Sequence, residues 1–192
     1  MQLRHGDRMN TWLTTDWHFG HNMLVDKGYR PPNYGVLIAE RLLHAVQPGD
    51  SVICLGDVFF YPPGRNQVED LLNQLAGKRV RTVLTPGNHD RESQRWYLKQ
   101  AWSWVCNEMV LHYQGNKVYF SHAPVIPYSD VDYLNIHGHL HAGMEDHRGG
   151  ILNDGRHILI SQEHLDYRPI TLDRVLQLRK TPVFRNGYFR AL

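Results

Sequence analysis

The chain has 192 residues, of which 42% are hydrophobic and 21% charged, and its formal net charge at pH 7 is +2. These values exclude a disordered or fibrous protein, and the length predicts a single domain over residues 1–192. No stretch is apolar enough for a secretion signal or a membrane span, and two cysteines cannot build a disulfide framework, so we expect a cytoplasmic protein without membrane association.

Histidine is the one residue type in clear excess. The chain has 13 histidines, whereas an ordinary globular chain of this length carries roughly four or five. They are scattered along the chain, so an affinity tag is not their source. Their placement relative to the predicted strands therefore becomes the main question.

The first half of the chain alternates apolar runs of strand type with segments of helical spacing. We predict strands over residues 11–15, 51–55 and 80–85, and helices over residues 36–46, 66–76 and 91–101. Pro62, Pro63 and Gly64 predict a loop before the second helix, and Gly77 is placed to follow its last turn. Such alternation is typical of α/β layers joined by right-handed crossovers.

The second half is richer in strand patterns. We predict strands over residues 105–113, 117–121, 133–136 and 157–161, and a last helix over residues 171–180. Gln114, Gly115 and Asn116 indicate a hairpin between the first two of these strands. Loops are expected at residues 125–132 and 143–150.

Polar side chains follow five of the predicted strands directly. They are Asp16 and His18 after the first strand, Asp57 after the second, Asn88, His89 and Asp90 after the third, His122 after residues 117–121, and His139 and His141 after residues 133–136. Strand alternation would place Asp16 and His18 on the same side. Each group alone has an ordinary structural explanation, but ligands of α/β folds bind at the carboxyl ends of strands, so together they predict one site.

The chemistry of this set indicates metal ions. Two carboxylates, one amide and four imidazoles suit Mn²⁺, Fe or Zn²⁺ better than Ca²⁺ or Mg²⁺. Seven ligands are too many for one ion but suit two ions that share a carboxylate. Two divalent ions on two carboxylates leave a surplus of about two positive charges, which favours an anionic substrate and in-line displacement at phosphorus. His89 is then free to protonate the leaving oxygen, with Asp90 holding its ring.

The order of these motifs closely resembles the signature of the calcineurin-like metallophosphoesterases, and the flanking residues look like the small single-domain bacterial and phage members. The resemblance spans Asp16 to His141 and implies a four-layer αββα sandwich, with two packed mixed β-sheets flanked by helices. It also implies the ligand sets: Asp16, His18, Asp57 and His141 for one metal, and Asp57, Asn88, His122 and His139 for the other. Asp57 would bridge the ions, and His89 and Asp90 would be the catalytic pair.

Several further residues are candidates for contacts around this site. His21 and Arg91 flank the motifs and are candidate substrate contacts, and Arg91 has the forked donor geometry that suits phosphate. The residues expected at the rim of the pocket are Arg30, Tyr34, Tyr61 and Arg65. Gly87 is expected to have a positive φ that lets the backbone turn close to the metals.

The sequence thus predicts a hydrolase that uses two divalent ions, with Mn²⁺ favoured and Fe, Zn²⁺ or Ni²⁺ as alternatives. Attack by a metal-bridging hydroxide on a phosphodiester, including a nucleotide or cyclic nucleotide, is the predicted reaction. Two alternatives stay open: a single-strand or end-processing nuclease, and a non-catalytic metal-binding scaffold. The absence of a basic tract argues against tight binding of a nucleic-acid polymer. The sequence determines neither the oligomeric state nor the preference between monoester and diester.

Overall fold

The computed structural model describes residues 9–60, 62–127, 132–141, 155–185 and 188–189. Its first sheet has the strand order β4-β3-β2-β1-β9. The bounds of these strands are Trp104–Val105, Arg81–Leu84, Ser51–Cys54, Thr11–Thr14 and Ile170–Thr171. Strands β1 to β4 are parallel and β9 is antiparallel to β1, so the sheet is mixed.

The second sheet has the strand order β10-β11-β8-β7-β6-β5. The bounds of these strands are Phe184–Arg185, Tyr188–Phe189, His157–Leu159, Leu134–His137, Asn116–Ser121 and Glu108–Tyr113. The central strands β6, β7 and β8 are parallel, whereas β5 and β10 each pair antiparallel to a neighbour. This sheet is therefore mixed as well.

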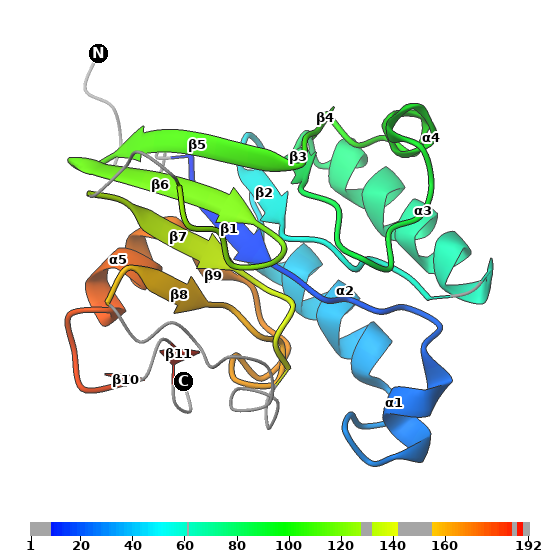
Figure 1. Cartoon of the computed structure of the whole chain (residues 1–192). Coiled ribbons are helices and arrows are strands. Elements are labelled where there is room, and N and C mark those ends of the chain that lie inside the picture. Colours follow the sequence, from blue (N-terminus) through cyan, green and yellow to red (C-terminus); the bar gives the residue numbers. More distant parts are fainter. Residues whose placement is uncertain (1–8, 61, 128–131, 142–154, 186–187, 190–192) are drawn as a thin grey trace.

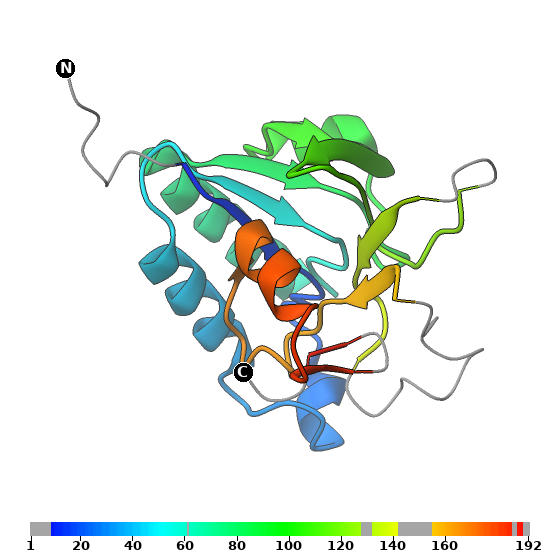
Figure 2. The same ribbon diagram turned by 90° about the vertical axis from the view of Figure 1, so that its left-hand side faces the viewer.

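The helices are α1 (Asn22–Asp26), α2 (Tyr34–Ala45), α3 (Pro62–Gly77), α4 (Gln94–Lys99) and α5 (Leu172–Leu178). Helices α2, α3 and α4 contribute to the apolar core on one face of the first sheet, α5 contributes to the core between the sheets, and α1 has no buried residues. Figure 1 shows α2 and α3 on the side of the first sheet that faces away from the second, and Figure 2 shows the same layers turned by 90°. Helix α5 packs on β1 and β9.

Strand alternation divides the apolar residues between two cores. In β2 and directly after it, Val52 and Cys54 pack among the helices, whereas Ile53 and Leu55 pack against the second sheet. The expected α/β fold of two packed mixed sheets with flanking helices is confirmed, and most of the helical cover lies on the first sheet. No helix in the described part of the chain is long and apolar enough to cross a membrane.

Several element boundaries differ from the predictions. Helix α3 begins at Pro62 rather than after Gly64, because proline is well tolerated in the first turn of a helix. The predicted strand over residues 105–113 is two strands in different sheets, β4 and β5. Helix α4 begins only after Ser93, whose hydroxyl accepts a hydrogen bond from the backbone N–H of Trp96. The predicted 143–150 loop and Tyr61 lie outside the described residues.

Candidate metal centre

The predicted ligands meet because the carboxyl ends of the parallel strands are in register. In the first sheet Thr14 lies opposite Cys54, which lies opposite Leu84. In the second sheet Ser121 lies opposite His137. The chain leaves each of these strands at the same end of its sheet, and the polar residues that follow converge from both sheets. All seven predicted metal ligands are brought to this place.

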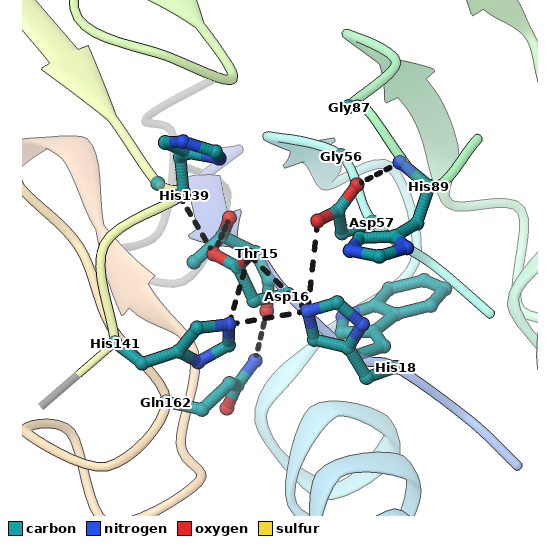
Figure 3. Close-up of polar contacts among 12 residues, drawn as sticks. Thr15, Asp16, His18, Gly56, Asp57, Gly87, His89, His139, His141 and Gln162 are labelled. Carbon is teal, nitrogen blue, oxygen red and sulfur yellow. Dashed lines mark hydrogen bonds and ion pairs between the residues drawn. The ribbon is translucent and has the colours of Figure 1, made fainter. Parts of the chain in front are cut away.

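One group of donors consists of Asp16, His18 and His141. The Nε2 atoms of His18 and His141 lie 3.2 Å apart. Asp16 Oδ1 lies 3.7 Å from Nε2 of His18 and 3.9 Å from Nε2 of His141. This oxygen is buried and has no hydrogen-bond partner among the described residues, although buried polar atoms are normally paired. Figure 3 shows the three side chains pointing toward one another.

The second group consists of Asp57, His122 and His139, with Asn88 beside it. His122 Nε2 lies 3.1 Å from Asn88 Oδ1 and 3.1 Å from His139 Nδ1. Asp57 Oδ2 lies 3.4 Å from Nε2 of His122.

Asp57 also faces the first group, because its Oδ2 lies 3.6 Å from Nε2 of His18. The other oxygen, Oδ1, accepts a hydrogen bond of 2.9 Å from the backbone N–H of His89. That bond leaves Oδ2 as the atom between the two groups, as a bridging carboxylate requires. Nitrogen and oxygen atoms that face one another at these distances fit two divalent cations, and Asp16 Oδ1 has no hydrogen-bond partner among the described residues.

The backbone at the predicted ligands adopts an unusual conformation. Four of them have positive φ angles: Asp16 at 48°, His18 at 48°, Asp57 at 54° and His139 at 73°. A non-glycine residue with positive φ costs of order 1–3 kcal/mol and tends to occur at functional sites. Asp16 and His18 therefore face the same place through left-handed turns that follow β1, and not through strand alternation as predicted.

Hydrogen bonds behind the ligands select which atoms face the site. His122 Nδ1 lies 2.7 Å from the backbone carbonyl oxygen of Leu55, so this nitrogen carries the proton. The lone pair of Nε2 is then available to a metal ion. Oδ2 of Asp16 accepts hydrogen bonds from the Thr15 hydroxyl at 2.6 Å and the backbone N–H of His139 at 3.1 Å. These bonds leave Oδ1 of Asp16 for a metal.

Burial shifts the protonation of the ligands in opposite directions. Desolvation lowers the pKa of His18 to about 4, although Asp16 acts to raise it, so this imidazole is neutral and available as a ligand at pH 7. Burial raises the pKa of Asp57 to about 7 against the charge of His122, with Asp16 adding to the rise. In the metal-free protein a proton on Asp57 thus competes with metal near neutral pH.

Asp90 has a different role from the one predicted. Its Oδ2 accepts hydrogen bonds from the backbone N–H groups of Asp57 at 2.7 Å and Gly87 at 2.8 Å, and its Oδ1 accepts one from Val58 at 3.0 Å. The carboxylate is occupied by backbone, so it does not hold the ring of His89. Asp90 instead ties the loop that carries Asp57 to the loop that follows β3.

Gly87 is needed for space and not for a positive φ, which it does not have. A Cβ at this position would lie 2.2 Å from Asp57 Oδ1 and 2.7 Å from Cε1 of His122. Any side chain here would therefore displace the carboxylate of Asp57. The predicted left-handed turn occurs instead at Gly56, where φ is 94°.

His89 lies beside the metal donors and forms part of a separate cavity. Its ring centroid is 5.2 Å from that of His18 and 4.9 Å from that of Phe60. His21 stacks on Phe60 with a centroid separation of 3.9 Å. A cavity of about 290 Å³ is lined in part by Phe60, His89 and Arg91, and the predicted rim residue Arg65 lines it as well. His21 thus supports the aromatic wall of this cavity.

Two predicted rim residues point inward. Arg30 is 3% exposed, and its guanidinium donates to the backbone carbonyl of Asp16 at 2.8 Å and to the carboxylate of Glu163 at 2.7 Å. Tyr34 is 5% exposed and donates its hydroxyl proton to the backbone carbonyl of His18. Both residues support the ligands from behind, because the segment that carries them is packed under the chain that follows β1.

Glu163 and Gln162 were not predicted, and they lie just behind the donors. Glu163 Oε1 is 3.3 Å from Nδ1 of His141. Gln162 donates hydrogen bonds to the hydroxyl of Thr14 and the carbonyl of Thr15, below Asp16 in Figure 3. Both follow the predicted strand 157–161, so the reasoning applied to the other strand ends would have found them.

The fold and the paired donor groups define an α/β protein with two groups of possible metal ligands at the strand ends. A family model described as calcineurin-like phosphoesterase matches residues 9–181, so the chain belongs to that family of metal-dependent phosphoesterases, as the resemblance implied. The chain is 27% identical over 172 residues to an uncharacterized protein of Methanocaldococcus jannaschii, covering 87% of this chain and 89% of that protein.

Among solved structures, a protein of unknown function from Aquifex aeolicus is similar, with a TM-score of 0.68 and 23% identity. The match covers 89% of this chain and 100% of the Aquifex chain. At this identity the likeness supports the fold alone.

Proposed function

We propose that this protein hydrolyses phosphodiesters with two divalent metal ions as cofactors, Mn²⁺ being the favoured ion. The proposal depends on one observation: two donor groups share the Asp57 carboxylate, and the imidazole of His89 lies beside them. Two ions bound there would activate a water as the nucleophile and polarise the phosphoryl oxygens. The residues of the chain would then bind the substrate and supply the proton that the leaving group needs.

His89 is the residue that we assign to the leaving group. No described residue donates a hydrogen bond to its ring or accepts one from it, so the imidazole is free to interact with substrate. Burial and the charge of Arg91 lower its pKa in the free protein. A bound phosphate anion would favour the protonated ring, which then donates its proton to the departing oxygen.

Two cavities favour a diester over a monoester. One of about 320 Å³ is lined in part by Asn88, His122 and His139, and the other, of about 290 Å³, adjoins His89. A diester carries two ester groups, and these cavities would hold one each, with the leaving group beside His89. Phe60 and Arg91 in the second cavity would suit a small phosphorylated partner such as a nucleotide.

The proposed site of action is the cytoplasm. Both cysteines are free: Cys54 is buried, and Cys106 is half-buried. Free thiols favour a reducing compartment.

The role of His89 predicts a dependence on the leaving group. We would assay aryl phosphodiesters with phenol leaving groups of different acidity, using the Mn²⁺-loaded wild type and His89→Ala. Loss of a general acid costs about 10²–10⁴-fold in rate, and we expect the loss to be largest for the least acidic phenol. His44→Ala, on the exposed end of α2, is the matched control and should retain wild-type rates.

Two results would contradict the proposal. An equal loss of rate in His89→Ala for all phenol leaving groups would show that His89 does not protonate the leaving group. A wild type that binds Mn²⁺ but hydrolyses neither diesters nor monoesters would favour a metal-binding scaffold, and cleavage of oligonucleotides alone would favour a nuclease.

A further inference from the structure

The two donor groups differ in charge. The group that contains His141 has a carboxylate of its own, Asp16, in addition to the shared Asp57. In the group that contains His122, the corresponding oxygen comes from the neutral amide of Asn88. A divalent cation is therefore attracted more strongly to the first group than to the second.

A second difference lies behind the histidines. Nδ1 of His141 is 3.3 Å from Oε1 of Glu163, a partly buried carboxylate whose side chain is 14% exposed. Nδ1 of His122 instead faces the neutral backbone carbonyl of Leu55. A carboxylate behind a histidine fixes its tautomer and makes the other nitrogen a stronger metal ligand.

Glu163 is held in place by two neighbours. Its Oε1 accepts a hydrogen bond of 2.7 Å from Nε of Arg30, and its Oε2 accepts one of 2.9 Å from the hydroxyl of Ser161. The Arg30 side chain is fully buried and also donates to the backbone carbonyl of Asp16. One arginine therefore positions both the carboxylate behind His141 and the backbone of another ligand.

The tautomer of His141 depends on what its Nε2 binds. Its Nδ1 is equally distant, at 3.3 Å, from Oε1 of Glu163 and from Nη2 of Arg30. Arg30 can only donate, and Glu163, ionised beside it, can only accept. A metal on Nε2 requires the proton to be on Nδ1, and that proton has an acceptor only in Glu163.

We propose that the two metal positions are unequal and that Glu163 is the positioning residue that makes the His141 position the tighter one. This inference concerns metal binding and rests on the metal centre of the proposed function, but it does not require hydrolysis. The first ion added to the metal-free protein goes to the Asp16, His18, His141 group. The second goes to the group that contains Asn88, whose side chain is exposed to solvent.

The test is a titration of the metal-free full chain with Mn²⁺, in which EPR measures the free ion. Wild type should bind two ions in two distinct steps. His141→Ala should remove the tighter step, and His122→Ala the weaker one. Glu163→Gln should weaken the tighter step by about 10–100-fold and leave the weaker step unchanged.

Two further variants separate positioning from general damage. Glu92→Gln breaks the partly exposed ion pair with Arg65 and should leave both steps unchanged. Glu163→Asp retains the charge and should weaken the tighter step less than Glu163→Gln. If circular dichroism shows that the Gln variant is unfolded, the Asp variant must itself weaken the tighter step selectively.

The proposal is overturned if Glu163→Gln leaves both steps intact or weakens them equally, or if His122→Ala removes the tighter step. An inactive protein with two such unequal steps would overturn the proposed function and leave this inference standing.

Discussion

The substitution Asp90→Asn distinguishes a structural clamp from a catalytic partner of His89. In the structure the carboxylate accepts three hydrogen bonds from backbone N–H groups, those of Asp57, Val58 and Gly87. Asparagine has nearly the same shape but offers only one acceptor oxygen. If that oxygen replaces Oδ2, the amide NH₂ group faces the N–H of Val58, and two donors are left opposed.

The magnitude follows from these three bonds. Two bonds change from charge-assisted to neutral, which costs about 1 kcal/mol each, and one buried N–H is left unsatisfied, which costs about 1–3 kcal/mol. Part of this is offset because burial raises the pKa of Asp90, so the ionised carboxylate is itself unfavourable in the fold. We expect the free energy of unfolding to fall by about 2–4 kcal/mol.

Urea denaturation of the metal-free protein measures this change, and Mn²⁺ titration measures its effect on the site. Asp50→Asn is a matched control: Asp50 is also buried and accepts hydrogen bonds from the backbone N–H groups of Asn10 and Gln47 and from the indole N–H of Trp12. Asp50→Asn should destabilise the fold by a similar amount but leave the affinity for Mn²⁺ unchanged, whereas Asp90→Asn should also weaken the affinity for Mn²⁺.

The same substitution is then made in the His89→Ala background. If Asp90 has a structural role, Asp90→Asn should lower the free energy of unfolding by the same amount in this background. The rate loss of the double variant should then equal the product of the two separate rate losses. The reasoning is refuted if the free energy of unfolding of Asp90→Asn lies within about 0.5 kcal/mol of the wild-type value and if the substitution causes no further loss of rate in the His89→Ala protein.

Two further predictions concern the carboxylate of Asp57. Gly87→Ala places a methyl group against Asp57 Oδ1 and should abolish the binding of one Mn²⁺ ion. Gly77→Ala, where the added methyl group meets no other atom, is the control and should bind two ions. Equal stoichiometry in the two variants would contradict this prediction. Because the pKa of Asp57 is raised to about 7, Mn²⁺ affinity should rise about tenfold from pH 6 to pH 8. In the metal-free protein, Asp57 makes the fold less stable as pH rises from 4 to 7, because the fold favours its protonated carboxyl. His18, whose pKa is lowered to about 4, acts in the opposite direction over this range. The melting temperature of Asp57→Asn minus that of wild type should therefore increase from pH 4 to pH 7, and a constant difference would exclude this contribution of Asp57.

Much of the fold could be predicted from local pattern. Strands β2 and β3 and helices α2 and α3 follow from apolar runs next to proline or glycine, and β1 follows from a short β-prone run. Such segments can be recognised because buried residues of strands and helices recur with a regular spacing in the sequence. The division between β4 and β5 could not be predicted. Both segments are strand-like, and nothing local specifies which sheet each joins. Strands β9, β10 and β11 have two residues each, too few to show a period.

The sequence by itself determined which side chains gather at the site. Each predicted ligand directly follows a strand, and parallel strands bring their carboxyl ends to one edge. The tertiary structure decided what supports them. Arg30 and Glu163 are 133 positions apart, and Asp90 reaches backbone 32 or 33 positions away. Such contacts depend on how loops from different strands pack, and no local spacing encodes them. Gly87 likewise owes its role to Asp57 and His122, which approach it only in the folded protein.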